Sequence, residues 1–338
     1  MNQRETPHLR LIATEEACAF PEQVAAMRTL AAHPGDDADL AMWNWVFSPG
    51  NATLLRRLLD LDTERIALMD EAGVDVHLLS LTAPGVQMFD ADTATTIASS
   101  TNDQLAEVVR RHPTRFAALA SFAPQDPKRA AREIDRAIST LKLNGLIVNS
   151  HTNGEYLDDR KFWPIFEAAA AVNAPLYIHP RNPPLPASLI LKGSYNLYSA
   201  IWGFHVETGI HAMRLIVNGV FDAFPDLQIV LGHMGEGLPF WLYRIDRRWR
   251  GTLKRGQPSD YVRNNFLMTT SGVNSHETLQ YCHSVLGADR LMFAIDYPYE
   301  ETLEAAQFIR TAPLPDADRE KIAHANAERV FRIAPRTA

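Results

Sequence analysis

Near its C-terminus the chain reads Arg290-Leu-Met-Phe-Ala-Ile-Asp-Tyr-Pro-Tyr299, and this stretch indicates the fold. A run of apolar residues, typical of a buried strand, ends abruptly at Asp296. Pro298 follows two residues later, and proline ends strand pairing because it has no N–H to donate. The acid is therefore expected where a buried strand opens into a loop. In an α/β barrel, that end of the strand belongs to the functional face.

Similar apolar runs precede this one, and helical patterns lie between most of them. The runs are residues 9–14, 74–81, 116–123, 145–148, 174–178, 227–231 and 266–268. Strand–helix alternation of this kind predicts a (β/α)8 TIM barrel that occupies residues 1–338 as a single domain. A doubly wound open sheet is the main rival. It normally carries a glycine-rich phosphate turn after its first strand, where this chain has Glu15-Glu-Ala-Cys18.

Two segments, residues 20–53 and 181–203, are too long to be plain connections. Both are rich in aromatic residues: Trp43, Trp45, Phe47, Tyr195, Tyr198 and Trp202. Long loops in compact domains are usually functional or disordered, and the aromatic content argues against disorder. We expect both segments to form walls or lids over the C-terminal face of the barrel. A dimer contact is the alternative, and both roles can hold together.

Composition narrows the classes of function. The chain has 338 residues, of which 46% are apolar, and its net charge of −7 argues against a nucleic-acid partner. Cys18 and Cys282 are too few for a disulfide framework, so a reducing, cytoplasmic compartment is expected. The first eight residues have no apolar core of a signal peptide, and no apolar stretch approaches the length of a membrane span. We therefore expect no membrane partner.

Residues able to bind a metal or transfer a proton sit at the ends of four expected strands: Glu15, His179, His233 and Asp296. Each alone has a structural interpretation, such as a solvated helix start, a strand cap, a hydrogen-bonded pair with Glu236 or a helix N-cap. Because the strand ends of a barrel converge around its axis, their coincidence predicts one shared site. A Glu–His–Asp set with open positions suits one divalent metal ion, and this donor set leaves both Mn²⁺ and Zn²⁺ open.

Several motifs resemble the amidohydrolase-related decarboxylases of hydroxylated aromatic acids, which include the γ-resorcylate, 2,3-dihydroxybenzoate and 5-carboxyvanillate decarboxylases. They are Ala13-Thr-Glu-Glu-Ala17, Thr82-Ala-Pro-Gly-Val-Gln87, His179-Pro180, Asn218-Gly-Val-Phe-Asp222, Gly232-His-Met-Gly-Glu236 and Asp296-Tyr-Pro298. The likeness is greatest to the 5-carboxyvanillate decarboxylases, through Asn149-Ser-His-Thr152, Val206-Glu-Thr-Gly209 and Trp241-Leu-Tyr-Arg244.

The resemblance implies that Glu15, His179 and Asp296 bind the metal. His233, paired with Glu236, would face the substrate. Either Asp296 or His233 would then donate the proton that the reaction requires, and the residues alone leave this choice open. The implied reaction is non-oxidative loss of CO₂ from an ortho-hydroxy aromatic acid after protonation of the ring carbon.

The same resemblance implies a set of substrate contacts. Arg244 would grip a carboxylate or phenolate, and Thr82, Tyr299 and His179 would also border the substrate. An alternative for Arg244 is a surface ion pair with Asp246 or Glu236. The relatives are usually dimers or tetramers, so a homodimer or homotetramer is expected.

Two departures from the family pattern bear on these expectations. Hydrolytic relatives carry His-x-His after the first strand, where this chain has Glu15-Glu-Ala17, and this favours one metal over two. Asn51 stands near the position where 5-carboxyvanillate decarboxylases place a substrate-binding arginine, and Arg56 or Arg57 would be the replacement.

A metal-dependent hydrolase or hydratase is the second hypothesis, and a binding protein without catalysis is the third.

Overall fold

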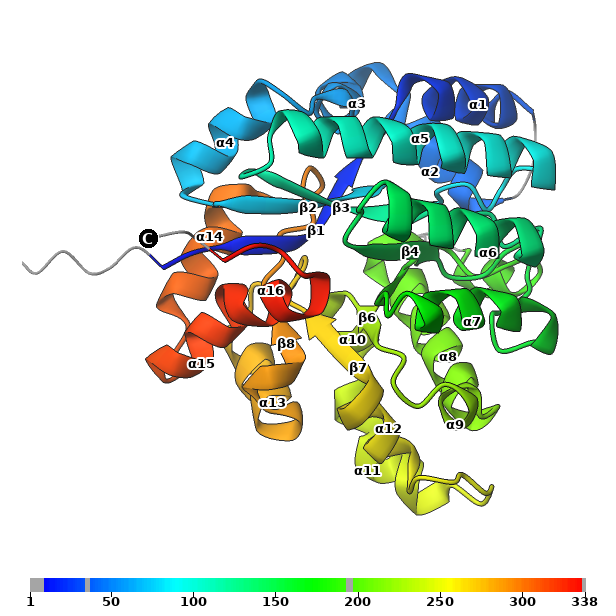
Figure 1. The fold of residues 1–338 in the computed structure, drawn as a ribbon, viewed down its shortest axis with the longest axis vertical. Helices are drawn as coiled ribbons and strands as arrows, with labels where there is room; N and C mark the ends of the chain where they lie inside the picture. Colours follow the sequence, from blue (N-terminus) through cyan, green and yellow to red (C-terminus); the bar gives the residue numbers. More distant parts are fainter. Residues whose placement is uncertain (1–8, 34–36, 193–196, 336–338) are drawn as a thin grey trace, which may run out of the picture.

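The computed structural model describes residues 9–33, 37–192 and 197–335. Its strands form one eight-stranded sheet in chain order, and each strand is parallel to the next. They are β1 (Ile12–Cys18), β2 (Val76–Leu81), β3 (Phe116–Ser121), β4 (Gly145–Asn149), β5 (Leu176–His179), β6 (Ile229–Leu231), β7 (Phe266–Thr269) and β8 (Leu291–Met292). Figure 1 shows the helices arranged around these strands. The prediction of a (β/α)8 barrel is confirmed.

The helices that connect and cover the strands differ widely in length. They are α1 (Pro21–Ala31), α2 (Ala38–Val46), η1 (Pro49–Asn51), α3 (Ala52–Leu59), α4 (Glu64–Ala72), α5 (Ala91–Arg111), α6 (Pro127–Asp135), η2 (Arg136–Thr140), η3 (Arg160–Phe162), α7 (Trp163–Ala171), η4 (Ala187–Leu191), η5 (Ser199–Ile201), α8 (Gly203–Val217), α9 (Val220–Ala223), α10 (His233–Glu236), α11 (Leu238–Arg248), α12 (Pro258–Asn265), α13 (His276–Leu286), η6 (Ala288–Arg290), α14 (Thr302–Thr311), α15 (Asp316–Glu320), η7 (Lys321–Ala325) and α16 (Asn326–Phe331). None of those in the described parts of the chain combines the length and apolarity needed to cross a membrane.

The sheet closes between β1 and the segment that follows β8. Although β8 itself is short, the chain continues alongside β1. There the Asp296 N–H donates to the Glu15 carbonyl at 3.1 Å and the Ala17 N–H donates to the Tyr297 carbonyl at 2.7 Å. These bonds place Glu15 and Asp296 at the same seam of the barrel, although they lie near opposite ends of the sequence.

The first strand differs from its expected position. The sequence places a strand at residues 9–14 with Glu15 and Glu16 beyond it, whereas β1 runs to Cys18 and contains both acids. Successive side chains of a strand point to opposite faces, so the two acids separate. Glu15 faces the barrel axis. The Glu16 carboxylate accepts the N–H of Ile295 at 3.0 Å and of Tyr297 at 3.2 Å, and so holds the seam from the other side.

Apolar side chains fill the N-terminal half of the barrel. The strands contribute Ile12, Val76, Leu78, Ala117, Leu119, Ile147, Val230, Leu267 and Met292, and α16 adds Ala327 and Phe331. Helix α16 therefore closes this end as a plug. Polar residues such as Glu15 and Asp296 lie at the opposite end of the barrel, directly above this apolar layer.

The two long segments stand over the C-terminal end of the barrel. The first carries α1, α2 and η1, and the second carries η4 and η5, while residues 34–36 and 193–196, with Tyr195, lie outside the described residues. The segments are joined because the Arg181 guanidinium contacts the Asp39 carboxylate at 2.6 Å. Trp43 is buried and donates its indole N–H to the carbonyl of Ala83, just beyond β2, at 3.0 Å. The expected walls over this face are therefore present.

Candidate active site

Three side chains that could bind a metal converge at the mouth of the barrel. Glu15 comes from β1, His179 from the end of β5 and Asp296 from the segment after β8. Each offers one ligand atom, and these atoms all lie within 4.8 Å of one another. That spacing is short enough for all three to contact a single ion.

The Glu15 carboxylate shows that the cluster fits a cation. Its Oε1 atom is buried and has no hydrogen-bond partner among the described residues. The nearest cluster atoms are His179 Nε2 at 3.3 Å and His233 Nε2 at 3.7 Å. A buried carboxylate oxygen without a donor is unfavourable in a folded protein, and a metal ion would supply the missing contact.

His179 is oriented as a metal-binding histidine would be. Its Nδ1 lies 2.8 Å from the Pro180 carbonyl, which can only accept, so Nδ1 carries the hydrogen. In its neutral form the ring would present the lone pair of Nε2 to a cation bound by Glu15 and Asp296. A hydrogen bond of this kind to the far nitrogen commonly fixes the orientation of a metal ligand.

Asp296 adopts a backbone conformation that is uncommon for its residue type. Its φ angle is +78°, in a region that residues with a side chain rarely occupy. The two N–H groups bound by Glu16 flank it on either side. Strained residues of this kind concentrate at functional sites, where the surrounding structure holds them in place.

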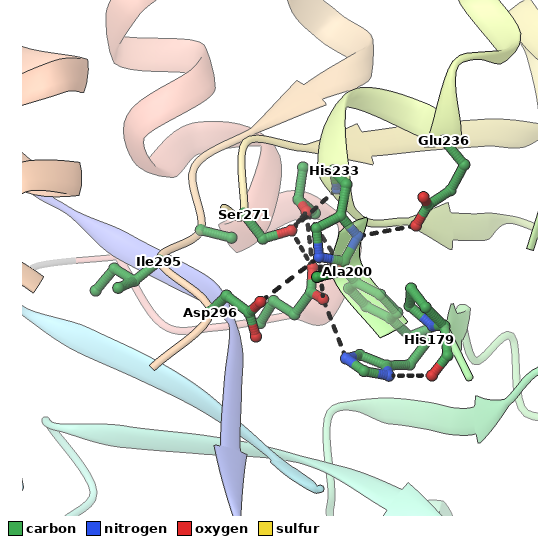
Figure 2. A network of polar contacts seen from close by, with 12 residues as sticks. His179, Ala200, His233, Glu236, Ser271, Ile295 and Asp296 are labelled. Carbon is green, nitrogen blue, oxygen red and sulfur yellow. Dashed lines mark hydrogen bonds and ion pairs between the residues drawn. The ribbon is translucent and has the colours of Figure 1, made fainter. Parts of the chain in front are cut away.

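His233 lies between two carboxylates, as Figure 2 shows. Its Nδ1 is 2.8 Å from Glu236 Oε1, and its Nε2 is 3.5 Å from Asp296 Oδ2. The other oxygen of Glu236 lies 2.7 Å from Nδ1 of His205, in the first turn of α8. Glu236 thus bridges two histidines. Sequence reasoning missed His205, and its place next to the Val206–Gly209 motif was the one signal for it.

The turn that carries His233 and Glu236 winds in the left-handed sense. All five residues from His233 to Gly237 have φ angles between +50° and +79°. A side chain at Gly232 would place its Cβ 2.7 Å from Glu15 Oε2, so only glycine fits beside that carboxylate. This turn brings both members of the His233–Glu236 pair to the site.

Burial and neighbouring charges shift the pKa values of the cluster in opposite directions. Burial alone would raise the pKa of Glu15, but the His233 and His179 imidazoles and a Ser271 hydrogen bond lower it to about 2. Burial raises the pKa of Asp296, against the opposing effect of His233, and the charge of Glu15 adds to the rise. Burial would lower the pKa of His233, but Glu236 and Glu15 raise it well above its usual range. The two carboxyl groups therefore differ strongly in proton affinity.

The expected substrate contacts fall into two groups. The hydroxyls of Thr82 and Tyr299 lie 2.7 Å apart and reach each other from opposite parts of the chain. Arg244, by contrast, is exposed on α11 and lines a groove of about 690 Å³ that also includes His205 and Glu236. Within the described residues it forms no ion pair, so the proposed pairing with Asp246 or Glu236 is absent.

Neither Arg56 nor Arg57 is free to replace the arginine expected near Asn51. The Asn51 side chain donates to the Trp45 carbonyl at 2.8 Å. Arg57 pairs with Glu64 at 2.9 Å, and Arg56 contacts the same carboxylate. Both guanidinium groups are therefore engaged outside the Glu15–His179–Asp296 cluster.

The fold and the cluster define a class of barrel proteins that hold a divalent cation at the C-terminal mouth. The chain belongs to the amidohydrolase family, whose model matches residues 37–333.

Individual relatives are more specific. The chain is 40% identical over 293 residues to the γ-resorcylate decarboxylase of Polaromonas sp., covering 83% of this chain and 90% of that protein. The crystal structure of 5-carboxyvanillate decarboxylase from Sphingomonas paucimobilis matches with a TM-score of 0.93 and 49% identity, over 96% of this chain and all of that one. The 5-carboxyvanillate decarboxylase of Novosphingobium aromaticivorans, solved with manganese and 4-hydroxy-3-methoxy-5-nitrobenzoic acid, matches with a TM-score of 0.89 and 39% identity, over 96% of each chain.

Proposed function

We propose that this protein is a metal-dependent, non-oxidative decarboxylase of ortho-hydroxy aromatic carboxylic acids, a carbon–carbon lyase. The observation that carries the proposal is the Glu15–His179–Asp296 cluster, in which one buried oxygen of Glu15 has no partner among the described residues and is left for a cation. The substrate class follows from the decarboxylase relatives, which the chain matches over most of its length.

The chemical problem is the aryl carbanion that direct loss of CO₂ would create. Protonation of the ring carbon before the C–C bond breaks avoids this species, and an ortho hydroxyl assists by donating electron density to that carbon. A bound divalent cation would supply positive charge that fixes the carboxylate and the ortho oxygen of the substrate. The protein must then hold a proton donor within hydrogen-bond reach of the ring carbon.

Asp296 is the proposed donor. Burial and the neighbouring Glu15 favour its protonated form, as a general acid requires. A bound cation acts in the opposite direction, so the proton would have to arrive with the substrate or be held by burial. His233 is the alternative donor because its Nε2 faces the same space and Glu236 keeps the ring oriented. Thr82, Tyr299, His179 and Arg244 stay predictions as substrate contacts.

Manganese is the proposed metal. Carboxylate oxygen ligands suit Mn²⁺, and a relative that matches over nearly the whole chain was solved with it. A single histidine in the set of three keeps Zn²⁺ as the alternative. Comparing decarboxylation by protein loaded with each metal decides between them.

One assay tests the function. The metal-loaded protein is incubated with 5-carboxyvanillate, γ-resorcylate and 2,3-dihydroxybenzoate while CO₂ and the ring product are measured, with aryl esters and lactones in parallel. Release of CO₂ with an intact ring supports the proposal. Hydrolysis without CO₂ would instead identify a hydrolase. Inactivity towards both the aromatic acids and the esters and lactones would contradict the proposal that the protein is an enzyme.

We also infer a homodimer or homotetramer. Large apolar side chains are exposed on neighbouring elements, including Ile201 at 68%, Trp202 at 55%, Phe240 at 67% and Trp241 at 52%. Trp202 and Trp241 line the same groove, and exposed apolar patches mark interaction sites. Light scattering coupled to size-exclusion chromatography measures the assembly, and a monomer at micromolar concentration would contradict it. We further propose that residues 1–338 form a single domain. We also propose a cytoplasmic location, which the two free buried cysteines favour.

A further inference from the structure

We infer that the hydroxyl groups of Tyr177, Thr269 and Ser271 form a cradle that holds one oxygen of Glu15 and so reserves the other for the metal. In this view the three are positioning residues for the cation. The inference rests on the proposed metal site and goes beyond it by assigning residues that carry no ligand atom.

All three hydroxyls converge on Oε2 of Glu15. Tyr177 and Ser271 donate to it, and Thr269 Oγ1 lies 3.1 Å from it. Each hydroxyl has a single hydrogen to donate, and the geometry lets each direct it to this oxygen. Hydrogen bonds to an ionised carboxylate are stronger than neutral ones, so the three together fix the group firmly.

The two oxygens of Glu15 are therefore unequal. Oε2 is saturated by donors, whereas Oε1 is buried without one and faces His179 and His233. The difference predicts that Glu15 binds the cation through Oε1 alone. A carboxylate that contributes one oxygen leaves a further coordination position open for the substrate.

The cradle is itself immobilised. All three residues are fully buried, and their hydroxyl oxygens are closely packed, with Thr269 Oγ1 3.0 Å from the Tyr177 oxygen and 2.9 Å from Ser271 Oγ. Ser271 Oγ also accepts the backbone N–H of His233 at 3.0 Å, which ties the cradle to the turn that carries the His233–Glu236 pair. Gly232 closes the remaining side, since a Cβ there would lie 3.1 Å from Ser271 Oγ. The carboxylate thus has little freedom to rotate.

The test measures Mn²⁺ binding by calorimetry on the chelator-treated full-length protein. Thr269→Val removes the hydroxyl and keeps the side-chain shape, whereas Thr269→Ser keeps the hydroxyl and removes a methyl. We expect Thr269→Val to weaken Mn²⁺ binding by about 10-fold or more, as is usual when the partner of a metal ligand is removed, and Thr269→Ser to stay within about 3-fold of wild type. Activity of Thr269→Val should recover as the Mn²⁺ concentration rises.

Tyr177→Phe provides the second variant, with Tyr261→Phe as its control. The control also removes a hydrogen-bonded hydroxyl, but the Tyr261 hydroxyl donates to Asp222 on α9 and not to Glu15. We expect a loss of Mn²⁺ affinity in Tyr177→Phe only, and thermal unfolding of the metal-free proteins separates this effect from misfolding. Wild-type affinity in Thr269→Val and Tyr177→Phe would overturn the cradle and leave the metal site standing. Failure of the wild-type protein to bind Mn²⁺ would overturn both.

Discussion

The two roles proposed for Asp296 make conflicting demands on its protonation state. As a metal ligand it should be ionised, and as a proton donor it should be protonated. Its burial and its neighbour Glu15 favour the protonated form, while His233 at 3.5 Å and any bound cation favour the ionised form. A residue in this balance can change its protonation state during a reaction cycle.

Asp296→Asn is the direct test of that role. Asparagine keeps the shape and an oxygen but cannot deliver the proton, so we expect kcat to fall by about 10²–10⁴-fold while substrate binding stays measurable. The assay is run at saturating Mn²⁺, with metal content determined for each protein. Asp289→Asn, the same change at an exposed residue before β8, serves as the control. Near wild-type turnover in the Asp296→Asn variant would remove Asp296 as donor and favour His233.

The sequence exposed some site residues better than others. Glu15, His179 and Asp296 could be found because charged or ligating residues interrupt apolar runs at strand ends. The hydroxyl of Tyr177 could not, because it lies inside β5 and looks like an ordinary strand residue. Thr269 ends β7, but a lone threonine at a strand end does not indicate metal binding. Their importance depends on which face of each strand meets Glu15, and that is fixed only when the barrel closes.

The left-handed turn at α10 contains two glycines that differ in why a side chain would be unfavourable: backbone conformation alone at Gly237, and conformation together with crowding at Gly235. Gly235 and Gly237 both have φ of +79°, but a Cβ at Gly235 would lie 2.1 Å from Met268 Sδ, whereas a Cβ at Gly237 meets nothing within 4 Å. Gly237→Ala should therefore destabilise the protein by about 1–2 kcal/mol through backbone strain alone. Gly235→Ala should cost a further ~1–3 kcal/mol from overpacking. Urea unfolding measures both, and equal losses would show that β7 yields freely.

Helix α8 carries a buried acid that should make stability depend on pH. Glu207 accepts hydrogen bonds from Ser150 at 2.9 Å and Tyr156 at 2.8 Å, and burial, opposed by these bonds, raises its pKa to about 7. Its pKa in the unfolded chain is near the usual 4.5. The folded state therefore binds the proton of Glu207 more tightly than the unfolded chain does. The stabilising contribution of this group to the free energy of unfolding is complete below pH 4.5 and is lost as the pH rises through 7.

The comparison of wild type with Glu207→Gln isolates this group. We expect the free energy of unfolding of wild type to decrease between about pH 5 and pH 8 relative to that of the glutamine variant, which cannot titrate. Urea unfolding of both proteins at each of these two pH values measures the difference in the free energy of unfolding. Parallel pH profiles of the two proteins would show that Glu207 keeps an ordinary pKa.

The elements also show where boundary prediction fails. Six strands, β2 to β7, lie within two residues of their apolar runs, since buried parallel strands are apolar on both faces. The eighth, β8, ends at Met292, although its apolar run continues to Ile295. The end of β1 was placed too early because Glu15 and Glu16 read as exposed residues. Both are buried, one towards the axis and one bonded to the seam, and only the closed barrel provides those environments.

For the whole molecule, the cluster predicts that metal binding and stability are coupled. Glu15, His179 and Asp296 come from distant parts of the chain and meet only in the folded state, so the unfolded chain cannot offer the same site. A free Mn²⁺ concentration about 100 times the dissociation constant should add about 2.7 kcal/mol to the free energy of unfolding. Urea titrations with and without Mn²⁺ measure this, and His179→Ala should lose most of the effect. Equal stabilisation of both proteins would place the bound ion elsewhere.

The seam between β1 and the segment after β8 has a consequence for how the protein is made. Glu15 is translated well before Asp296, so a nascent chain on the ribosome cannot assemble the pocket until Asp296 has left the exit tunnel. Products terminated before Asp296 would lack one of the proposed ligands and would not compete with finished molecules for the metal.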